Sequence, residues 1–167
     1  MHAQSLACER LIAKSIQRRE AQVIRIEAEA LDLLADSLPQ SFVDACDVML
    51  SARGRIVITG VGEPGHIGRK WAATLAATGT SAIYIHPAEA AHGDPRMLVE
   101  GDVLVVISKS GNTSELRAFL SYAERIGVMI VGVASRLDSF VMQRAGSSFV
   151  FPPHVRLVRG ALNSTIG

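Results

Sequence analysis

The sequence predicts an α/β protein in which a parallel β-sheet carries helices on both faces. Short β-branched or apolar segments alternate with helical patterns along most of the chain, which is typical of parallel sheets. Glycine and hydroxyl residues cluster directly after two of these segments, where such a sheet binds its ligands. The expected strands are residues 55–59, 82–85, 103–107, 128–134 and 148–151.

The composition favours one domain with a small ligand. A chain of 167 residues, 49% hydrophobic and 20% charged, is long enough for one well-buried core and short for two. The net charge is +1 and the charges are interspersed, so no nucleic-acid or membrane patch is expected. Cys8 and Cys46 lack metal-site spacing, which predicts no metal and a reducing cytoplasm. No signal peptide or membrane span is expected.

The N-terminal part is expected to be helical. Residues 5–36 contain neither glycine nor proline, and only Arg19 interrupts their apolar seam. A helix this long cannot bury its whole stripe on a small sheet, so we expect it to pack against a partner subunit. The alternative is an ordinary helix that covers its own domain. Pro39 ends the pattern, and a second helix follows. The seam consists of Ile12, Ile16, Val23, Ile26, Ala30 and Leu33.

The first strand leads into a glycine-rich loop, residues 60–68, and then into a helix. These glycines let the backbone approach a ligand or a neighbouring element closely. Their spacing contains GxGxxG, but a dinucleotide site also needs an acidic residue at the end of the second strand. The chain has His86 and Pro87 there, and Glu89 comes slightly late. A nucleotide-binding oxidoreductase is therefore only a minor alternative.

The third strand, residues 103–107, is apolar throughout and leads into a loop rich in hydroxyls before an amphipathic helix. Unpaired N–H groups at a helix N-terminus favour an anion, and small side chains let it approach. The loop therefore predicts a phosphomonoester site. The alternative is that Ser110 or Asn112 merely caps the helix. The loop residues in question are Ser108, Ser110, Gly111, Thr113 and Ser114.

Together these loops resemble the sugar isomerase (SIS) domain family, and within it the arabinose-5-phosphate isomerases of lipopolysaccharide biosynthesis. The likeness extends from about Ala7 to Arg144. Its most specific segment is residues 86–94, His-Pro-Ala-Glu-Ala-Ala-His-Gly-Asp. The other matching segments are residues 60–62, 65–70, 72–74 and 78–80, with Ser108, Ser110, Gly111, Ser114 and Glu115.

The resemblance implies a three-layer αβα sandwich with a five-stranded parallel sheet in flavodoxin-like order, preceded by a long N-terminal helix. It also implies a homodimer or homotetramer. The single domain, residues 1–167, would comprise N-terminal helices (1–52), a phosphosugar-binding α/β core (53–151) and a divergent tail (152–167).

The resemblance also assigns binding roles. Ser108, Ser110 and Thr113 match the family's phosphate-binding hydroxyls. Further substrate-binding positions are matched by Gly62, His66 and His86. No metal or cofactor is implied.

Two residues match positions in or near the family's catalytic pocket, His92 and Glu115. Aldose–ketose isomerisation needs a base that moves a proton between adjacent carbons and an acid that serves the oxygens, so a carboxylate and an imidazole suit it. The alternatives are a histidine that bonds the loop backbone and a first-turn glutamate favoured by the helix dipole.

The chain departs from the family pattern at three places. Glu63-Pro64 stands where the family usually has Lys-Ser, and Asn112 where it often has Glu. Residues 155–167 offer no counterpart of the second catalytic carboxylate and the late histidine, and the paired CBS domains are absent. We therefore expect a weakened isomerase that converts D-ribulose 5-phosphate to D-arabinose 5-phosphate. The alternative is a noncatalytic phosphosugar-binding module with a regulatory role.

Overall fold

The computed structural model describes the backbone of residues 2–92 and 97–150 and the side chains of residues 12–90 and 97–150. The chain divides into two compact units, residues 39–151 and residues 1–38 with 152–167. The first unit contains the sheet, and the second contains the long helix α1 (His2–Asp36). The predicted tail, residues 152–167, lies outside the described residues.

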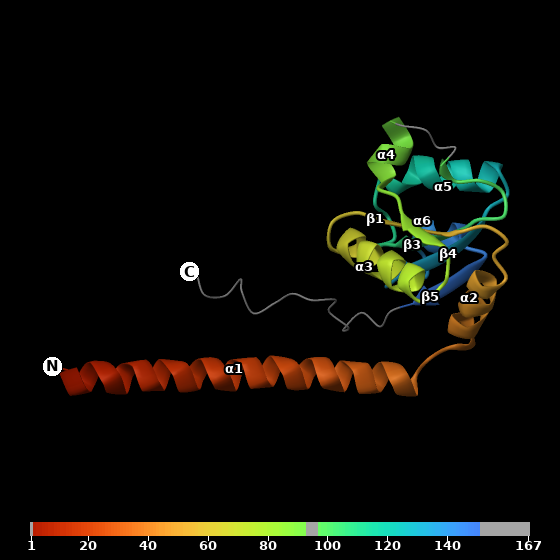
Figure 1. The fold of residues 1–167 in the computed structure, drawn as a ribbon. Helices are drawn as coiled ribbons and strands as arrows, with labels where there is room; N and C mark the ends of the chain where they lie inside the picture. Colours follow the sequence, from red (N-terminus) through yellow and green to blue (C-terminus); the bar gives the residue numbers. More distant parts are fainter. Residues whose placement is uncertain (1, 93–96, 151–167) are drawn as a thin grey trace. The chain divides into compact units, whose positions relative to one another are not determined.

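The sheet has five parallel strands in the order β2-β1-β3-β4-β5, which confirms the predicted flavodoxin-like order (Figure 1). Every residue of β1 and β3 is buried, as expected for strands covered on both faces. The strands are β1 (Ile56–Gly60), β2 (Ala82–Tyr84), β3 (Val103–Ile107), β4 (Met129–Ala134) and β5 (Ser147–Val150).

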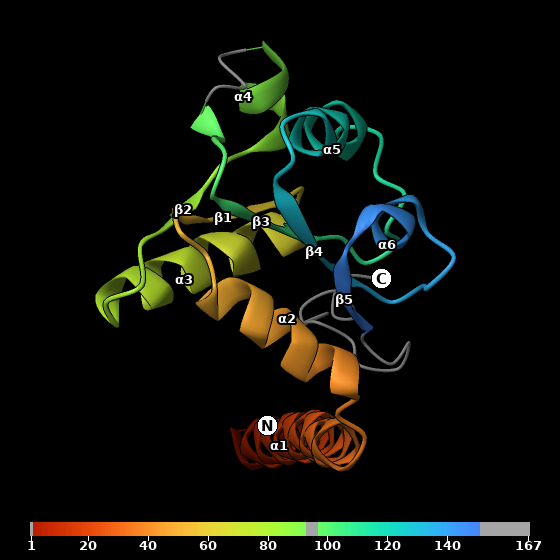
Figure 2. The same cartoon turned by 90° about the vertical axis from the view of Figure 1, so that its right-hand side faces the viewer.

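Helices cover both faces of the sheet, so the predicted three layers are confirmed (Figure 2). One face carries α2 (Gln40–Leu50) and α3 (Glu63–Ala77). The other carries α4 (Pro87–His92), α5 (Leu116–Arg125) and α6 (Phe140–Arg144).

Residues 87–92 were expected to form a loop, and that expectation was wrong, because they form the helix α4. The physical reason is local. Pro87 stands at the first helical position, where its missing N–H costs nothing. The residues after it, Ala-Glu-Ala-Ala, have high helix propensity.

The core on the α5 side follows from the strand alternation. Leu104 and Val106 of β3 point to the same face and pack with Leu116, Phe119 and the rest of the apolar stripe of α5. Helix α6 lies so close to β4 that a Cβ on Gly132 would come within 2.9 Å of the Ala145 side chain. The sequence therefore allows α6 to pack directly on the strand.

Helix α1 confirms the predicted long helix. Its seam residues Ile12, Ile16, Ile26 and Leu33 are each more than half exposed. Within the described part of the chain, no helix is both long and apolar enough to cross a bilayer. Assembly through this seam remains a prediction.

Candidate functional site

Three loops meet the carboxyl edge of the sheet, after β1, β2 and β3. Strand β1 lies between β2 and β3, so the chain reverses its direction of winding between β1 and β3. Ligands of open α/β sheets bind at such a reversal point. The predicted binding loops therefore lie where this fold places a ligand.

The glycine loop after β1 is shaped by Tyr84. The Tyr84 hydroxyl donates a 2.6 Å hydrogen bond to the Gly60 carbonyl. A Cβ on Gly65 would lie 2.8 Å from that hydroxyl, and one on Gly68 would lie 3.2 Å from the ring. Gly62 has a φ of +67° in open space, so its backbone conformation requires glycine. Packing and turn geometry thus explain these glycines without a dinucleotide.

The N-terminus of α3 is a poor anion site. Glu63 is exposed at the first helical position and brings a negative charge. Pro64 follows it and has no N–H to donate. The His66 N–H donates to the Gly62 carbonyl, and the His66 side chain is exposed. The loop after β1 therefore offers polar contacts more suited to sugar hydroxyls than to a phosphate.

The loop after β3 has the opposite character. The Ser108 hydroxyl is buried, lies 3.0 Å from the Thr113 hydroxyl and accepts a 3.1 Å bond from the Gly111 N–H. The Ser110 hydroxyl is exposed and accepts from the Asn112 N–H at 3.2 Å. Ser108 therefore shapes the loop from inside, whereas Ser110 presents a hydroxyl at its surface.

This loop also keeps backbone donors unpaired. Within the described residues, the N–H groups of Ser110, Thr113 and Ser114 make no hydrogen bond. They precede α5, whose dipole favours an anion at this end. An oxyanion placed here would receive several hydrogen bonds without disturbing the loop.

Glu115 stands at the end of the same loop. Its carboxylate accepts a 2.8 Å bond from the Ser114 hydroxyl. Its own backbone N–H, the Ser114 hydroxyl and the charge of protonated His86 lower the pKa of the Glu115 carboxyl below its usual value. The group is therefore ionised at neutral pH, in the form that can accept a proton.

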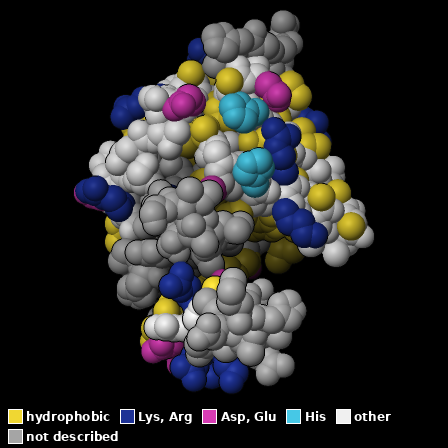
Figure 3. All heavy atoms as spheres, turned by 90° about the vertical axis from the view of Figure 1, so that its left-hand side faces the viewer, with side chains coloured by type: hydrophobic (Ala, Val, Ile, Leu, Met, Phe, Trp, Pro, Cys, Tyr) yellow, Lys and Arg dark blue, Asp and Glu magenta, His cyan; other side chains and the backbone are white. Residues whose placement is uncertain are grey.

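His86 comes from the loop after β2. Its Nδ1 accepts a 3.2 Å bond from the Ala88 N–H, so the neutral imidazole carries its proton on Nε2. The ring is therefore oriented as a donor to a substrate oxygen. Histidine side chains gather on one face of the molecule, among acidic and basic side chains (Figure 3). His66 and His86 are the histidines whose side chains the structure describes.

His92 is the last residue of α4, and its side chain lies outside the described residues. Its predicted catalytic role stays a prediction. No cluster of three or more potential metal ligands is found among the described residues.

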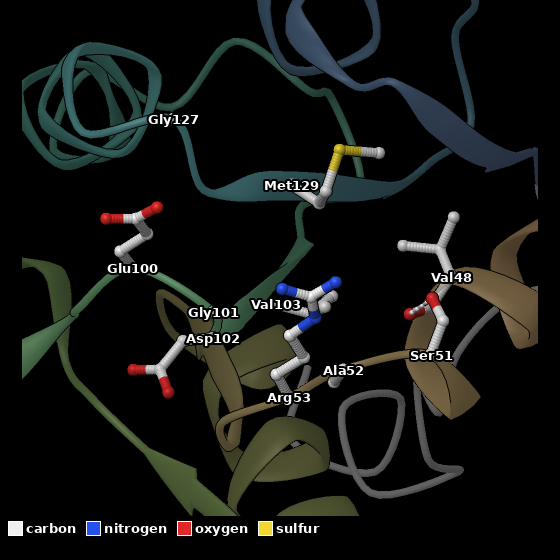
Figure 4. A pocket seen from close by; sticks show the side chains of 10 residues that line it. All are labelled: Val48, Ser51, Ala52, Arg53, Glu100, Gly101, Asp102, Val103, Gly127 and Met129. Carbon is white, nitrogen blue, oxygen red and sulfur yellow. Dashed lines mark hydrogen bonds between the residues drawn. The ribbon is translucent and has the colours of Figure 1, made fainter.

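A hollow of about 450 Å³ lies at the opposite, amino edge of the sheet (Figure 4). Its buried Asp102 carboxylate accepts from the Arg55 N–H at 2.7 Å and the Val99 N–H at 3.1 Å, and pairs with the Arg55 guanidinium at 3.3 Å. This carboxylate is committed to joining β1 and β3. The lining residues are Val48, Ser51, Ala52, Arg53, Glu100, Gly101, Asp102, Val103, Gly127 and Met129.

The fold and these loops define an α/β domain with a candidate anion site at its carboxyl edge. Residues 49–155 match the family model described as SIS domain. The chain therefore belongs to the SIS domain family.

Two relatives are each named Arabinose 5-phosphate isomerase KdsD. The chain is 40% identical over 118 residues to the one from Pseudomonas aeruginosa, which covers 71% of this chain. It is 40% identical over 129 residues to the one from Escherichia coli (strain K12), which covers 77% of this chain. The matches span 36% and 39% of the two relatives' own lengths.

A solved structure of E. coli CFT073 c3406, in complex with a sugar phosphate, is 32% identical to this chain and superposes with a TM-score of 0.79. The match covers 83% of this chain and 74% of that chain.

Proposed function

We propose that this chain binds a small sugar phosphate and isomerises it between aldose and ketose, in the manner of the arabinose-5-phosphate isomerases. The substrate would be D-ribulose 5-phosphate and the product D-arabinose 5-phosphate. The observation that carries this proposal is the loop after β3, where unpaired N–H groups and an exposed hydroxyl adjoin the ionised Glu115. The similarity to two proteins of that name supports it.

In this proposal the phosphate lies on the loop after β3. The N–H groups of Ser110, Thr113 and Ser114 and the Ser110 hydroxyl donate to its oxygens, and the α5 dipole adds to the attraction. Ser108 keeps the loop in the shape that points these donors outward. The sugar then extends toward Glu115, with Gly62, His66 and His86 beside its hydroxyls.

The chemistry needs one base and one acid. The Glu115 carboxylate takes a proton from C1 of the ketose while the C2 carbonyl oxygen receives one, which gives the 1,2-enediol. Glu115 then returns its proton to C2, and the C1 hydroxyl loses its proton as the aldehyde forms. His92 would serve the oxygens, and the Nε2–H of His86 would hold one of them. No cofactor is needed for this proton transfer.

A second candidate is a noncatalytic phosphosugar-binding module that regulates a partner. Glu63 and Pro64 favour it, because they give the α3 terminus a negative charge and remove a donor. Both proposals include a homodimer or homotetramer in the cytoplasm. The isomerase would supply lipopolysaccharide biosynthesis.

A coupled isomerase assay with D-ribulose 5-phosphate, set beside calorimetric binding of the same sugar, separates the two candidates. Turnover that Glu115→Gln abolishes while binding persists supports the isomerase. Binding with no turnover in the unmodified chain supports the module. A chain that neither binds nor converts the sugar refutes both.

A further inference from the structure

Helix α6 begins without a cap of its own. The residue before it, Ser139, is fully buried, and its hydroxyl has no hydrogen-bond partner among the described residues. The first N–H groups of a helix need acceptors from outside the helix. The acceptors for Phe140 and Val141 come from the loop after β3.

Two bonds make this connection. The Phe140 N–H donates to the side-chain Oδ1 of Asn112 at 3.0 Å, and the Val141 N–H donates to the Gly111 carbonyl at 3.0 Å. A Cβ on Gly111 would overlap the Ser139 hydroxyl, so the loop and the helix end lie in direct contact. The loop after β3 therefore caps a helix that is distant in the sequence.

The Asn112 amide is used at both ends. Its Nδ2 donates to the Ser110 carbonyl at 3.3 Å while its Oδ1 accepts from Phe140. The same residue's backbone N–H donates to the Ser110 hydroxyl at 3.2 Å. Asn112 thus connects the exposed residue of the predicted phosphate site to the helix α6.

Helix α6 is itself fixed to the core. The Val141 side chain is fully buried, Met142 is buried, and both lie against the Gly132 position of β4. A loop tied to this helix takes on the rigidity of the sheet. A loop without the tie samples other shapes, and its apparent affinity falls in proportion to the fraction that remains competent to bind.

We infer that Asn112 is a positioning residue, which holds the phosphate-binding loop in its binding shape by capping α6. It acts through Ser110 and Gly111 and needs no contact with the ligand. This inference rests on the proposed phosphate site. It would explain how an asparagine serves at a position where the resembling isomerases often carry a glutamate.

The test compares three variants of the full chain by titration calorimetry with inorganic phosphate and with D-ribulose 5-phosphate. Asn112→Ala removes the cap and the tie, and should raise both dissociation constants roughly tenfold at unchanged stoichiometry. Asn112→Asp keeps the acceptor for the Phe140 N–H but adds a negative charge. Gln40→Ala is the control, because it removes an exposed amide bonded only to Asp44 on α2 and should change nothing.

Salt distinguishes positioning from charge. In about 0.5 M salt the added charge is screened, so the affinity of Asn112→Asp should come within about threefold of the unmodified chain while that of Asn112→Ala stays about tenfold weaker. A merely structural effect would lower the stoichiometry and leave the dissociation constants unchanged. If Asn112→Ala does not fold, the recovery of Asn112→Asp in salt decides the question alone.

The outcomes separate this inference from the proposed function. If the unmodified chain binds neither probe, both are overturned. If it binds and Asn112→Ala binds equally well, the positioning role alone is overturned. Equal weakness of the alanine and aspartate variants in high salt also overturns it, because the retained acceptor would then contribute nothing.

Discussion

The Tyr84 hydroxyl donates a 2.6 Å hydrogen bond to the Gly60 carbonyl, which joins the end of β2 to the end of β1. The Arg69 guanidinium lies over the Tyr84 ring, 4.2 Å from its centre. This arrangement fills the space beside Gly65 and Gly68. The glycine loop therefore depends on one aromatic residue 24 positions further along the chain.

Tyr84→Phe should lower the free energy of unfolding by about 1 kcal/mol, because it removes this hydrogen bond and keeps the ring. Burial, partly opposed by the charge of Arg69, raises the pKa of the Tyr84 hydroxyl above its usual value of 10.0. The stability from the neutral hydroxyl is therefore complete below pH 10 and is lost as the pH rises through the higher folded pKa. Denaturation by urea should show the difference between Tyr84 and Tyr84→Phe narrowing above pH 10. A constant difference across this range would contradict the assignment.

Much of the fold could be predicted because its signals are local. Apolar runs marked β1 and β3, and the absence of glycine and proline marked α1. The ends of β1, β2, β4 and β5 differ from prediction by one residue, since β-ladder pairing and not apolarity sets where a strand ends.

The interactions within the candidate site could not be predicted in the same way. The bonds of Tyr84 to Gly60 and of Phe140 to Asn112 join residues 24 and 28 positions apart. Nothing in the local pattern of either residue specifies its partner. A tyrosine ending a strand that follows a loop of closely spaced glycines was the only available signal for the first pair.

Ser110→Ala should weaken binding of a sugar phosphate by roughly ten- to a hundredfold, because it removes one hydrogen bond to a charged group. The domain should remain folded, since the Ser110 side chain is exposed. Ser51→Ala is the matched control, an exposed serine at the amino edge whose hydroxyl bonds only the Val48 carbonyl. Calorimetric affinity unchanged in Ser110→Ala would reject the phosphate site.

Asp102→Ala should be the most destabilising of the substitutions considered. The carboxylate side chain is 1% exposed and accepts from two backbone N–H groups as well as from Arg55. Its removal leaves the Arg55 and Val99 N–H groups without acceptors, at a cost of about 2–4 kcal/mol. Glu100→Ala, at the exposed neighbouring carboxylate, should cost less than about 0.5 kcal/mol. Equal denaturation midpoints for the two variants would show that Asp102 has no such role.

Charged substitution in the α1 seam should dissociate the proposed oligomer. Ile16→Glu or Ile26→Glu would place an unpaired charge in an apolar interface. Gln17→Glu adds the same charge beside the seam and should leave the assembly intact. Sedimentation velocity measures the outcome, and a monomeric unmodified chain would end the proposal.

Glu63→Lys tests the clearest departure from the family pattern. If Glu63 faces the bound anion, the substitution exchanges repulsion for attraction, and affinity for a sugar phosphate should rise tenfold or more at low salt. The gain should shrink as salt screens the charges. Glu100→Lys makes the same change in net charge at the opposite edge of the sheet, so it controls for long-range attraction. We expect the gain in affinity without full catalysis, because residues 155–167 offer no counterpart of two acid–base groups of the resembling isomerases. Turnover at an ordinary enzyme rate of roughly 1–1000 per second from this one substitution would refute that expectation. A fall in affinity would instead show that Glu63 itself contacts the sugar.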